Sequence, residues 1–240
     1  MKKKIAVITG GYKGNGKAIV DKFLQNNFKV YSLDIEYKKN YFSEKLVKLK
    51  INLEKTTEIE KVIKLIKKRE NSINVLVNNA GVSLKSNSKN FFKAWQKTLA
   101  VNLTAPYLVS LMCLPMLKKN NKSSIVNISS LNGKVAMSNN PSYNASKGGI
   151  SALTMSQALD FSKYNIRVNA VSPGYIKTDM TKKSYNNSKE YKKRVNRIML
   201  NEYGFPNDVA NAVFFLASES AAYVNSSEII VDGGFLKKGI

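Results

Sequence analysis

The chain has no histidine, a single cysteine and only four arginines among its 240 residues. Without imidazole, a serine-hydrolase triad and a histidine-ligated zinc site are excluded, so any proton must be moved by Tyr, Lys, Asp, Glu or Cys113. A single cysteine also permits no internal disulfide, which agrees with a reducing, cytoplasmic location. We expect no metal site.

Long apolar runs are absent as well, together with linkers rich in Pro, Gly or Ser and internal repeats. We therefore expect a soluble single domain over residues 1–240, with no membrane association. The N-terminal lysines resemble a secretion signal only superficially, because the apolar stretch that follows them ends at Thr9. We interpret this stretch as a first strand.

Acidic residues are scarce, with 16 Asp and Glu against 39 Lys and Arg, and the net charge is +23. Such an excess can indicate nucleic acid, an anionic membrane or an acidic partner. Nearly all of it is lysine, and base edges are read mainly by arginine forks, so no nucleic acid is expected. The joint abundance of Lys, Asn and Ile is typical of compositional drift in a coding sequence.

Short β-branched runs alternate with longer helical patterns along the whole chain. Strands are predicted at residues 5–8, 28–33, 46–51, 73–77, 124–128, 166–171 and 228–231. Helices are predicted at residues 15–26, 56–69, 91–118, 143–163 and 207–217. The alternation predicts an α/β fold, namely a Rossmann-like, doubly wound, seven-stranded and mainly parallel sheet with helices on both faces. Ligands bind such sheets beyond the carboxyl ends of the strands.

Tyr143 and Lys147 are four residues apart in a segment predicted to open a helix, so they share one face. A phenol normally titrates near pH 10, and an ammonium a few ångströms away favours the phenolate and lowers that pKa. The same spacing is common on solvated helices. The Tyr143–Lys147 spacing is therefore interpreted together with other residues, which include Ser130, thirteen residues before the tyrosine.

A glycine-rich turn from Thr9 to Gly16 follows the first strand and precedes an amphipathic helix. Glycine lets the backbone approach a pyrophosphate, while the helix N-terminus offers free amides. The spacing is G-x-x-x-G-x-G instead of the general G-x-G-x-x-G. Asp34 ends the second predicted strand, where a carboxylate holds ribose hydroxyls and repels a 2′-phosphate. NAD is therefore the expected cofactor.

Taken in order over essentially the whole chain, these motifs resemble the short-chain dehydrogenase/reductase family in its single-domain form. The catalytic positions that the resemblance implies are Asn102, Ser130, Tyr143 and Lys147. The cofactor-binding positions that it implies are Thr9, Gly10, Tyr12, Lys13, Gly14, Asn15, Gly16, Asp34, Asn52, Leu53, Asn79, Ala80, Gly81, Tyr143, Lys147, Pro173, Gly174, Ile176 and Thr178.

The resemblance also implies a role for each catalytic residue. Tyr143 would take a proton from a substrate alcohol, or give one to a carbonyl oxygen, while hydride passes between the substrate and the nicotinamide. Lys147 would lower the tyrosine pKa and bind the nicotinamide ribose. Ser130 would hold the substrate oxygen, and Asn102 would hold a water in a relay to solvent.

Four residues depart from the family's pattern, and Lys13 bears on the choice of cofactor. Asn52 stands where an Asp usually contacts the adenine, and we expect its carbonyl to accept the same bond. Lys13 is a residue type that phosphorylated-cofactor enzymes of the family use, so NADP is the alternative cofactor. We favour NAD because Asp34 repels a 2′-phosphate, whereas Lys13 only adds attraction. Ser226 and Asn201-Glu202 also depart, and nothing in the sequence explains them.

The function implied by the resemblance is hydride transfer between a nicotinamide cofactor and a secondary alcohol or carbonyl compound, such as a sugar derivative or hydroxy acid. A lid is expected at about 178–203, where seven Lys and Arg against three Asp and Glu indicate an anionic substrate. The helices of 91–118 and 143–163 resemble those that pair subunits in the family. A homodimer or tetramer is therefore expected, with Ala145, Gly148, Gly149 and Ala152 allowing close helix approach.

Alternatives remain open at this point. An NADPH-dependent 3-oxoacyl-(acyl-carrier-protein) reductase is permitted by Lys13 and the basic surface, and disfavoured by Asp34. A non-catalytic cofactor-binding regulator, or a nucleic-acid binder, would belong to a different class. The intact catalytic set opposes the regulator, and the missing arginine clusters oppose the nucleic-acid binder.

Overall fold

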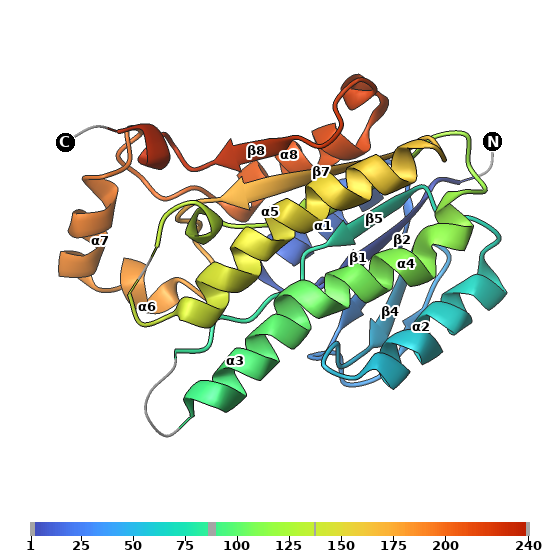
Figure 1. Cartoon of the computed structure of the whole chain (residues 1–240), viewed down its shortest axis with the longest axis horizontal. Helices are drawn as coiled ribbons and strands as arrows, with labels where there is room; N and C mark the ends of the chain where they lie inside the picture. The colour runs from blue at the N-terminus through green and yellow to red at the C-terminus, as the bar shows by residue number, and fades with distance from the viewer. Residues whose placement is uncertain (1–2, 86–89, 137, 239–240) are drawn as a thin grey trace.

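The computed structural model describes residues 3–85, 90–136 and 138–238. Its centre is an eight-stranded sheet with the order β3-β4-β2-β1-β5-β6-β7-β8 (Figure 1). The strands are β1 Ile5–Thr9, β2 Lys29–Asp34, β3 Tyr41–Phe42, β4 Leu46–Lys50, β5 Val75–Asn78, β6 Ser123–Ile128, β7 Ile166–Pro173 and β8 Glu228–Val231. Neighbouring strands are parallel except for β3, which is antiparallel to β4.

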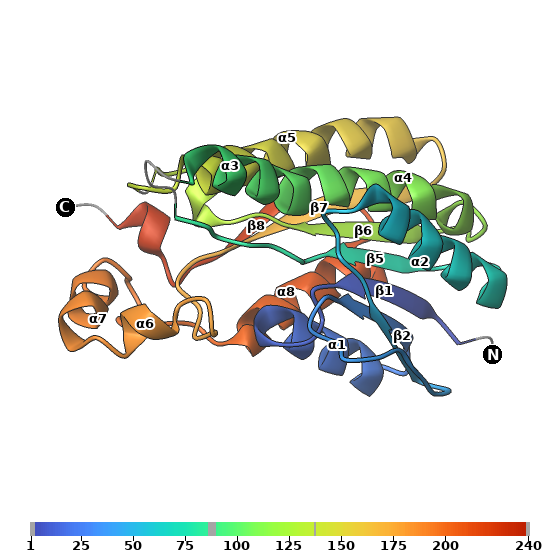
Figure 2. The same ribbon diagram turned by 90° about the horizontal axis from the view of Figure 1, so that it is seen from below.

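Helices cover both faces of the sheet, with α2, α3, α4 and α5 on one side and α1 and α8 on the other (Figure 2). The helices are α1 Gly14–Gln25, α2 Thr56–Arg69, α3 Phe91–Leu99, α4 Ala105–Leu117, α5 Pro141–Ser162, α6 Lys182–Tyr185, α7 Ser188–Val195 and α8 Pro206–Ala217. The predicted Rossmann-like, doubly wound architecture is thus confirmed. All five residues of β1 are buried, as expected for a central strand covered on both faces.

The sequence predicted seven strands, and the eighth is β3 at the edge of the sheet. It has only two residues, Tyr41 and Phe42, and both are exposed. A strand this short leaves no alternating pattern in the sequence, so periodicity could not reveal it. The guanidinium carbon of Arg69 lies 4.5 Å from the Phe42 ring centroid, which covers part of this edge.

The helix predicted at 91–118 is interrupted by a π-helical turn, Ala100–Thr104, between α3 and α4. Such turns insert one extra residue into a helix and often occur at functional sites. This one contains Asn102, whose side chain is buried. The turn therefore fixes the direction in which a predicted catalytic residue leaves the helix.

By length and apolar composition, the stretch Phe91–Leu117 could cross a membrane, contrary to the expectation that no run would qualify. Core helices of soluble proteins pass the same test. In this stretch, α4 buries Val109, Cys113 and Met116 in the core cluster that it shares with α2 and β1. Its apolar character is therefore explained in part by packing over the sheet.

The chain leaves β1 for β2 and β4 on one side, and then returns to β5 and β6 on the other. The strand order thus reverses between β1 and β5, and a crevice for ligands is expected beyond their carboxyl ends. Thr9 ends β1, Asn78 ends β5 and Ile128 ends β6. The predicted site residues follow these strand ends.

Candidate active site

The glycine turn between β1 and α1 is shaped by positions where only glycine fits. Gly10 and Gly14 have φ values of +69° and +55°, in the left-handed region. A Cβ on Gly16 would overlap the carbonyl oxygen of Gly10. Lys13, at the N-cap of α1, provides no side-chain cap, and the first turn carries no acidic residue. The first amides of α1 are therefore available to an anion.

The Asn79-Ala80-Gly81 segment is hydrogen-bonded to the start of the glycine turn. Thr9 Oγ1 accepts hydrogen bonds from the backbone amides of Asn79 (3.0 Å) and Ala80 (3.1 Å). In return, Asn79 Nδ2 donates to the carbonyl oxygens of Thr9 (3.0 Å) and Gly10 (2.9 Å). The carboxyl ends of β1 and β5 are thus held together.

Tyr143 and Lys147 lie one turn apart on α5, and Lys147 Nζ is 5.7 Å from the centroid of the Tyr143 ring. Lys147 is 3% exposed, and its ammonium donates a 2.6 Å hydrogen bond to the carbonyl oxygen of Ile128. Burial lowers the pKa of Lys147 from 10.5 to about 8. The lysine is therefore poised to exchange a proton near neutral pH.

Ser130 hydrogen-bonds the Tyr143 phenol and thereby lowers the pKa of the tyrosine, but burial raises that pKa by more. The net shift is therefore upward, opposite to the lowering expected from the sequence. Ser130 also accepts a 3.2 Å hydrogen bond from the backbone amide of Asn132, in the 3-10 turn Leu131–Gly133. This bond fixes the direction of the serine hydroxyl.

Asn102 is held at both ends of its amide. Its Oδ1 accepts from the backbone amide of Val82 (2.8 Å), and its Nδ2 donates to the Val82 carbonyl (2.9 Å) and to Ser146 Oγ (3.1 Å). Gly81 lies between the side chains of Asn102 and Lys147, since a Cβ on Gly81 would be 3.5 Å from Asn102 Oδ1 and 3.6 Å from Lys147 Nζ. The structure thus places Asn102 next to Lys147.

Asp34 closes β2 beside the glycine turn. Its carboxylate accepts hydrogen bonds from the backbone amides of Tyr12 (3.0 Å) and Glu36 (2.9 Å). The ammonium of Lys13 lies 3.6 Å from a carboxylate oxygen of Glu36. The cation that favours NADP in the sequence is therefore already paired with an anion, although both side chains are about half exposed.

Asn52 and Leu53 follow β4, the neighbour of β2 in the sheet. Asn52 Oδ1 accepts a 3.0 Å hydrogen bond from the backbone amide of Glu54 and so forms a local turn. An adenine amino group would use the second lone pair of the same oxygen. Leu53 packs against the core cluster on the α2 face of the sheet.

The segment from Pro173 to Thr178 runs from the end of β7 toward the glycine turn. Gly174 packs so closely against Asp232 that a Cβ would lie 2.7 Å from the Asp232 Cβ. Ile176 is buried and forms a parallel bridge with Gly204. A Cβ on Gly14 would lie 3.4 Å from the Thr178 methyl group, so the two predicted cofactor segments face each other.

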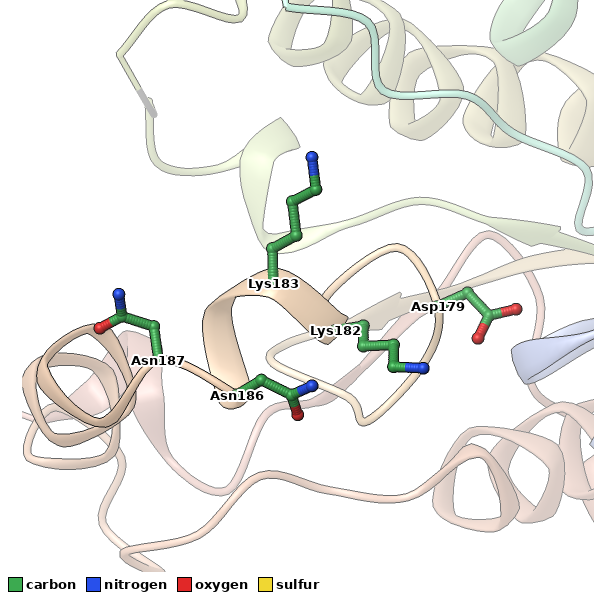
Figure 3. A pocket seen from close by; sticks show the side chains of 5 residues that line it. All are labelled: Asp179, Lys182, Lys183, Asn186 and Asn187. Carbon is green, nitrogen blue, oxygen red and sulfur yellow. The ribbon is translucent and has the colours of Figure 1, made fainter.

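The predicted lid contains α6 and α7. An open pocket beside α6 is lined by Asp179, Lys182, Lys183, Asn186 and Asn187. Figure 3 shows Lys182 and Lys183 leaving α6 in different directions. Within the described residues, neither ammonium takes part in a salt bridge.

Four contributors to the site were missed from the sequence. The Ile128 carbonyl and the Val82 backbone carry no side-chain signal, so no pattern could have revealed them. Ser146 bonds Asn102 from a position adjacent to Lys147. Glu36 was the one detectable omission, because an acidic residue two positions after Asp34 lies close enough to pair with Lys13.

Comparisons with known proteins match nearly the whole chain. A family model described as Enoyl-(Acyl carrier protein) reductase matches residues 10–236. A 3-oxoacyl-(acyl-carrier-protein) reductase of Thermotoga maritima is 34% identical, over 97% of this chain and 98% of that protein. An NAD-dependent glycerol dehydrogenase of Listeria innocua is 32% identical, over 98% and 94%. The ligand-free aldohexose dehydrogenase of Thermoplasma acidophilum superposes with a TM-score of 0.91 at 29% identity, over 99% and 96%.

Proposed function

The chain belongs to the short-chain dehydrogenase/reductase family, and on that premise we propose that it interconverts a secondary alcohol and a carbonyl compound with NAD. One observation carries the proposal. The Tyr143 phenol hydrogen-bonds Ser130, one helical turn from the buried Lys147, at the edge where β6 ends. This arrangement matches a proton-transfer centre, because a phenol, a hydroxyl and an ammonium converge at the mouth of the nucleotide crevice.

The residues around the crevice fit a dinucleotide. The close contact of Gly16 with Gly10 and the uncapped start of α1 form a cradle for a pyrophosphate. Among the described residues, Asn15 Oδ1 in the same turn has no hydrogen-bond partner although it is buried, which marks a polar atom that a ligand would satisfy. When bound, the nicotinamide accepts or donates the hydride.

Tyr143 exchanges the proton at the substrate oxygen. In oxidation its phenolate takes the proton of the alcohol, and in reduction its phenol gives a proton to the carbonyl oxygen. Ser130 donates a hydrogen bond to the same oxygen and holds it within reach of the phenol. Both side chains are already in contact, so the alignment requires only that the Ser130 hydroxyl rotate its single proton toward the substrate oxygen.

Lys147 supports this transfer from one helical turn further along α5. Its lowered pKa lets it pass a proton onward near neutral pH, and its ammonium also suits a hydroxyl of the nicotinamide ribose. Asn102 Oδ1 retains one lone pair beside Gly81, where a water can connect Lys147 to solvent. We assign these roles to the two residues on that basis.

NAD is favoured over NADP by two carboxylates. Asp34 lies beside the glycine turn, where it would hold the ribose hydroxyls, and Glu36 pairs with Lys13. A 2′-phosphate would therefore meet one carboxylate directly and would have to compete with another for the lysine. The NAD-dependence of the Listeria innocua relative supports the same choice.

A polyhydroxylated or hydroxy-acid substrate is supported by the relatives that act on glycerol and on aldohexoses. Lys182 and Lys183 on α6 line an open pocket and form no salt bridge with any described residue, which supports an anionic group on that substrate. The second candidate is a 3-oxoacyl-(acyl-carrier-protein) reductase, which the relative of Thermotoga maritima supports. Asp34 and Glu36 oppose it where the reaction needs NADPH.

The deciding experiment measures kcat/KM for a panel of polyols, aldoses, hydroxy acids and a 3-oxoacyl thioester, each with both cofactors. We expect the highest value for a polyol, aldose or hydroxy acid with NAD. Tyr143→Phe should still bind NADH, as measured by NADH fluorescence, but it should no longer turn over substrate. A preference for NADPH and the 3-oxoacyl thioester would overturn the proposal in favour of the second candidate.

We also propose that segment 178–203 acts as a lid, that the chain self-associates as a dimer or tetramer, and that it works in the cytoplasm. The lid proposal is supported by the position of α6 between the glycine turn and α7. Self-association is supported by exposed apolar side chains on the outer faces of α4 and α5. The buried, unpaired thiol of Cys113 agrees with a reducing compartment.

A further inference from the structure

We propose that Glu228, on the last strand, is a positioning residue that holds the Ser130 turn and helix α5 in their catalytic register. The proposal rests on the function proposed above. Glu228 touches none of the reacting groups named there, and it acts through the side chains that bind its carboxylate.

The Glu228 carboxylate receives three hydrogen bonds from three different parts of the chain. Lys134 Nζ donates at 2.8 Å, Ser151 Oγ donates at 3.1 Å, and Ser172 Oγ donates to the second oxygen. The Glu228 side chain is 16% exposed. Burial opposes ionisation, yet the bonds from Lys134 and Ser172 outweigh it and lower the pKa of Glu228. The carboxylate is therefore charged at neutral pH.

Lys134 links Glu228 to the catalytic serine. It directly follows the 3-10 turn Leu131–Gly133, which begins after Ser130. Gly133 packs so tightly on α5 that a Cβ would lie 2.8 Å from the carbonyl oxygen of Lys147. The ion pair of Lys134 with Glu228 thus holds the serine turn against the helix that carries Tyr143 and Lys147.

Ser151 links Glu228 to the catalytic helix itself, one turn after Lys147. Its hydroxyl also lies 3.3 Å from Ser129 Oγ, which in turn donates a 3.0 Å hydrogen bond to the carbonyl oxygen of Lys147. The residue before Ser130 and the backbone of Lys147 are therefore joined to the same network. A partly buried network of this kind fixes one arrangement because each of its members satisfies another.

Loss of the Glu228 charge should weaken the contacts that hold the Ser130 turn against α5, without altering the cofactor cradle formed by Gly10, Gly16 and the start of α1. Lys134 would remain as a partly buried cation without its anion, and it would turn toward solvent. The 3-10 turn would then lose its tie to β8, and Ser130 would move relative to Tyr143. A displacement of about 1 Å between reacting groups can cost about a hundredfold in rate.

The test compares Glu228→Gln, Lys134→Met and their double variant with Glu70→Gln as the matched control. Glu70 is similarly buried (12% exposed) and pairs with Lys29 at 2.6 Å, but Lys29 begins β2, which β1, β5, β6 and β7 separate from β8 in the sheet. We expect each of the two single variants at the network to lower kcat about tenfold to a hundredfold, with the KM for NAD changed less than about twofold. The double variant should be no slower than the worse single variant.

Glu70→Gln should lower Tm to a similar extent and leave kcat unchanged. Unchanged kcat in Glu228→Gln, with a Tm loss like that of the control, would overturn the proposal. If Glu228→Gln fails to fold, Lys134→Met tests the same link. If the wild-type protein turns over no substrate, the proposed function fails, but the positioning role of Glu228 can still be tested by hydrogen exchange of the peptide 129–135. Faster exchange in Glu228→Gln or Lys134→Met supports the proposal, and unchanged exchange overturns it.

Discussion

The ammonium of Lys147 donates a 2.6 Å hydrogen bond to the carbonyl oxygen of Ile128, the last residue of β6. A carbonyl offers only a partial negative charge, so it compensates little of the solvation that Lys147 loses on burial. This is why the pKa of Lys147 lies at about 8 and not at 10.5. The charged form of Lys147 is therefore less stable in the folded protein than in the unfolded chain.

Replacement of Lys147 should therefore change how the free energy of unfolding depends on pH. Between the folded pKa of about 8 and the unfolded pKa of 10.5, the unfolded chain binds more protons, so stability contributed by this group rises with pH. Relative to Lys147→Met, the free energy of unfolding of the wild-type protein should rise by about 2 kcal/mol between pH 7 and pH 10. Urea titrations at several pH values measure this difference, and a constant difference would contradict the shift.

Cofactor preference should depend on the Lys13–Glu36 ion pair. Glu36→Gln frees the lysine for a 2′-phosphate and removes a nearby negative charge. We expect kcat/KM with NADP to rise about twofold to fivefold, and kcat/KM with NAD to change less than about twofold, because an exposed ion pair contributes at most about 1 kcal/mol. The double variant Glu36→Gln/Lys13→Met is the control and should lose most of the gain. An equal change with both cofactors would show that the pair plays no part in the preference.

Two glycines, one in the glycine turn and one inside α5, offer substitutions with opposite expected effects. Gly16→Ala would drive a Cβ into the Gly10 carbonyl, so it should weaken NADH binding at least about tenfold, as followed by fluorescence titration. Gly148→Ala is the control, because its Cβ would be 3.8 Å from the nearest group and the residue lies inside α5. This alanine should raise the free energy of unfolding by about 0.5–1 kcal/mol, as alanine does in a helix interior. Wild-type NADH affinity in Gly16→Ala would disprove a cradle at this turn.

The sequence predicted the doubly wound fold because buried parallel strands are short, β-branched runs that cannot be mistaken for loops. It also predicted that the glycine turn and Asp34 follow the carboxyl ends of two strands of one sheet, and in the structure they follow the neighbouring strands β1 and β2. These predictions rested on side-chain type and order, which a sequence displays directly. Their agreement with the fold needed no knowledge of distances.

Other features depend on three-dimensional contacts that no pattern encodes. The π turn around Asn102 is one extra residue in a helix, and the Ile128 carbonyl that binds Lys147 belongs to the backbone. The pKa of Tyr143 was predicted to fall because only its neighbour Lys147 is visible in the sequence, whereas burial depends on the whole fold and raises it. Gly149 was expected at a subunit contact, but a Cβ there would be 2.8 Å from Leu103 of the same chain.

Self-association should depend on the outer faces of α4 and α5. Tyr107 and Leu111 on α4, and Met155 and Leu159 on α5, are one helical turn apart within each pair and are exposed, and Leu159 is 77% exposed. The two helices lie side by side over the same face of the sheet (Figures 1 and 2). Burial of one leucine from each subunit contributes about 1.5–3 kcal/mol apiece, and a carboxylate in its place would add like-charge repulsion across a two-fold axis.

Leu159→Glu should therefore convert the oligomer to a smaller species, by light scattering at micromolar concentration. Leu200→Glu is the matched control, because Leu200 is 71% exposed but lies between α7 and α8, away from α4 and α5. It should leave the mass unchanged. A monomeric wild-type protein would refute self-association, and dissociation by Leu200→Glu but not by Leu159→Glu would move the contact to the lid side of the molecule.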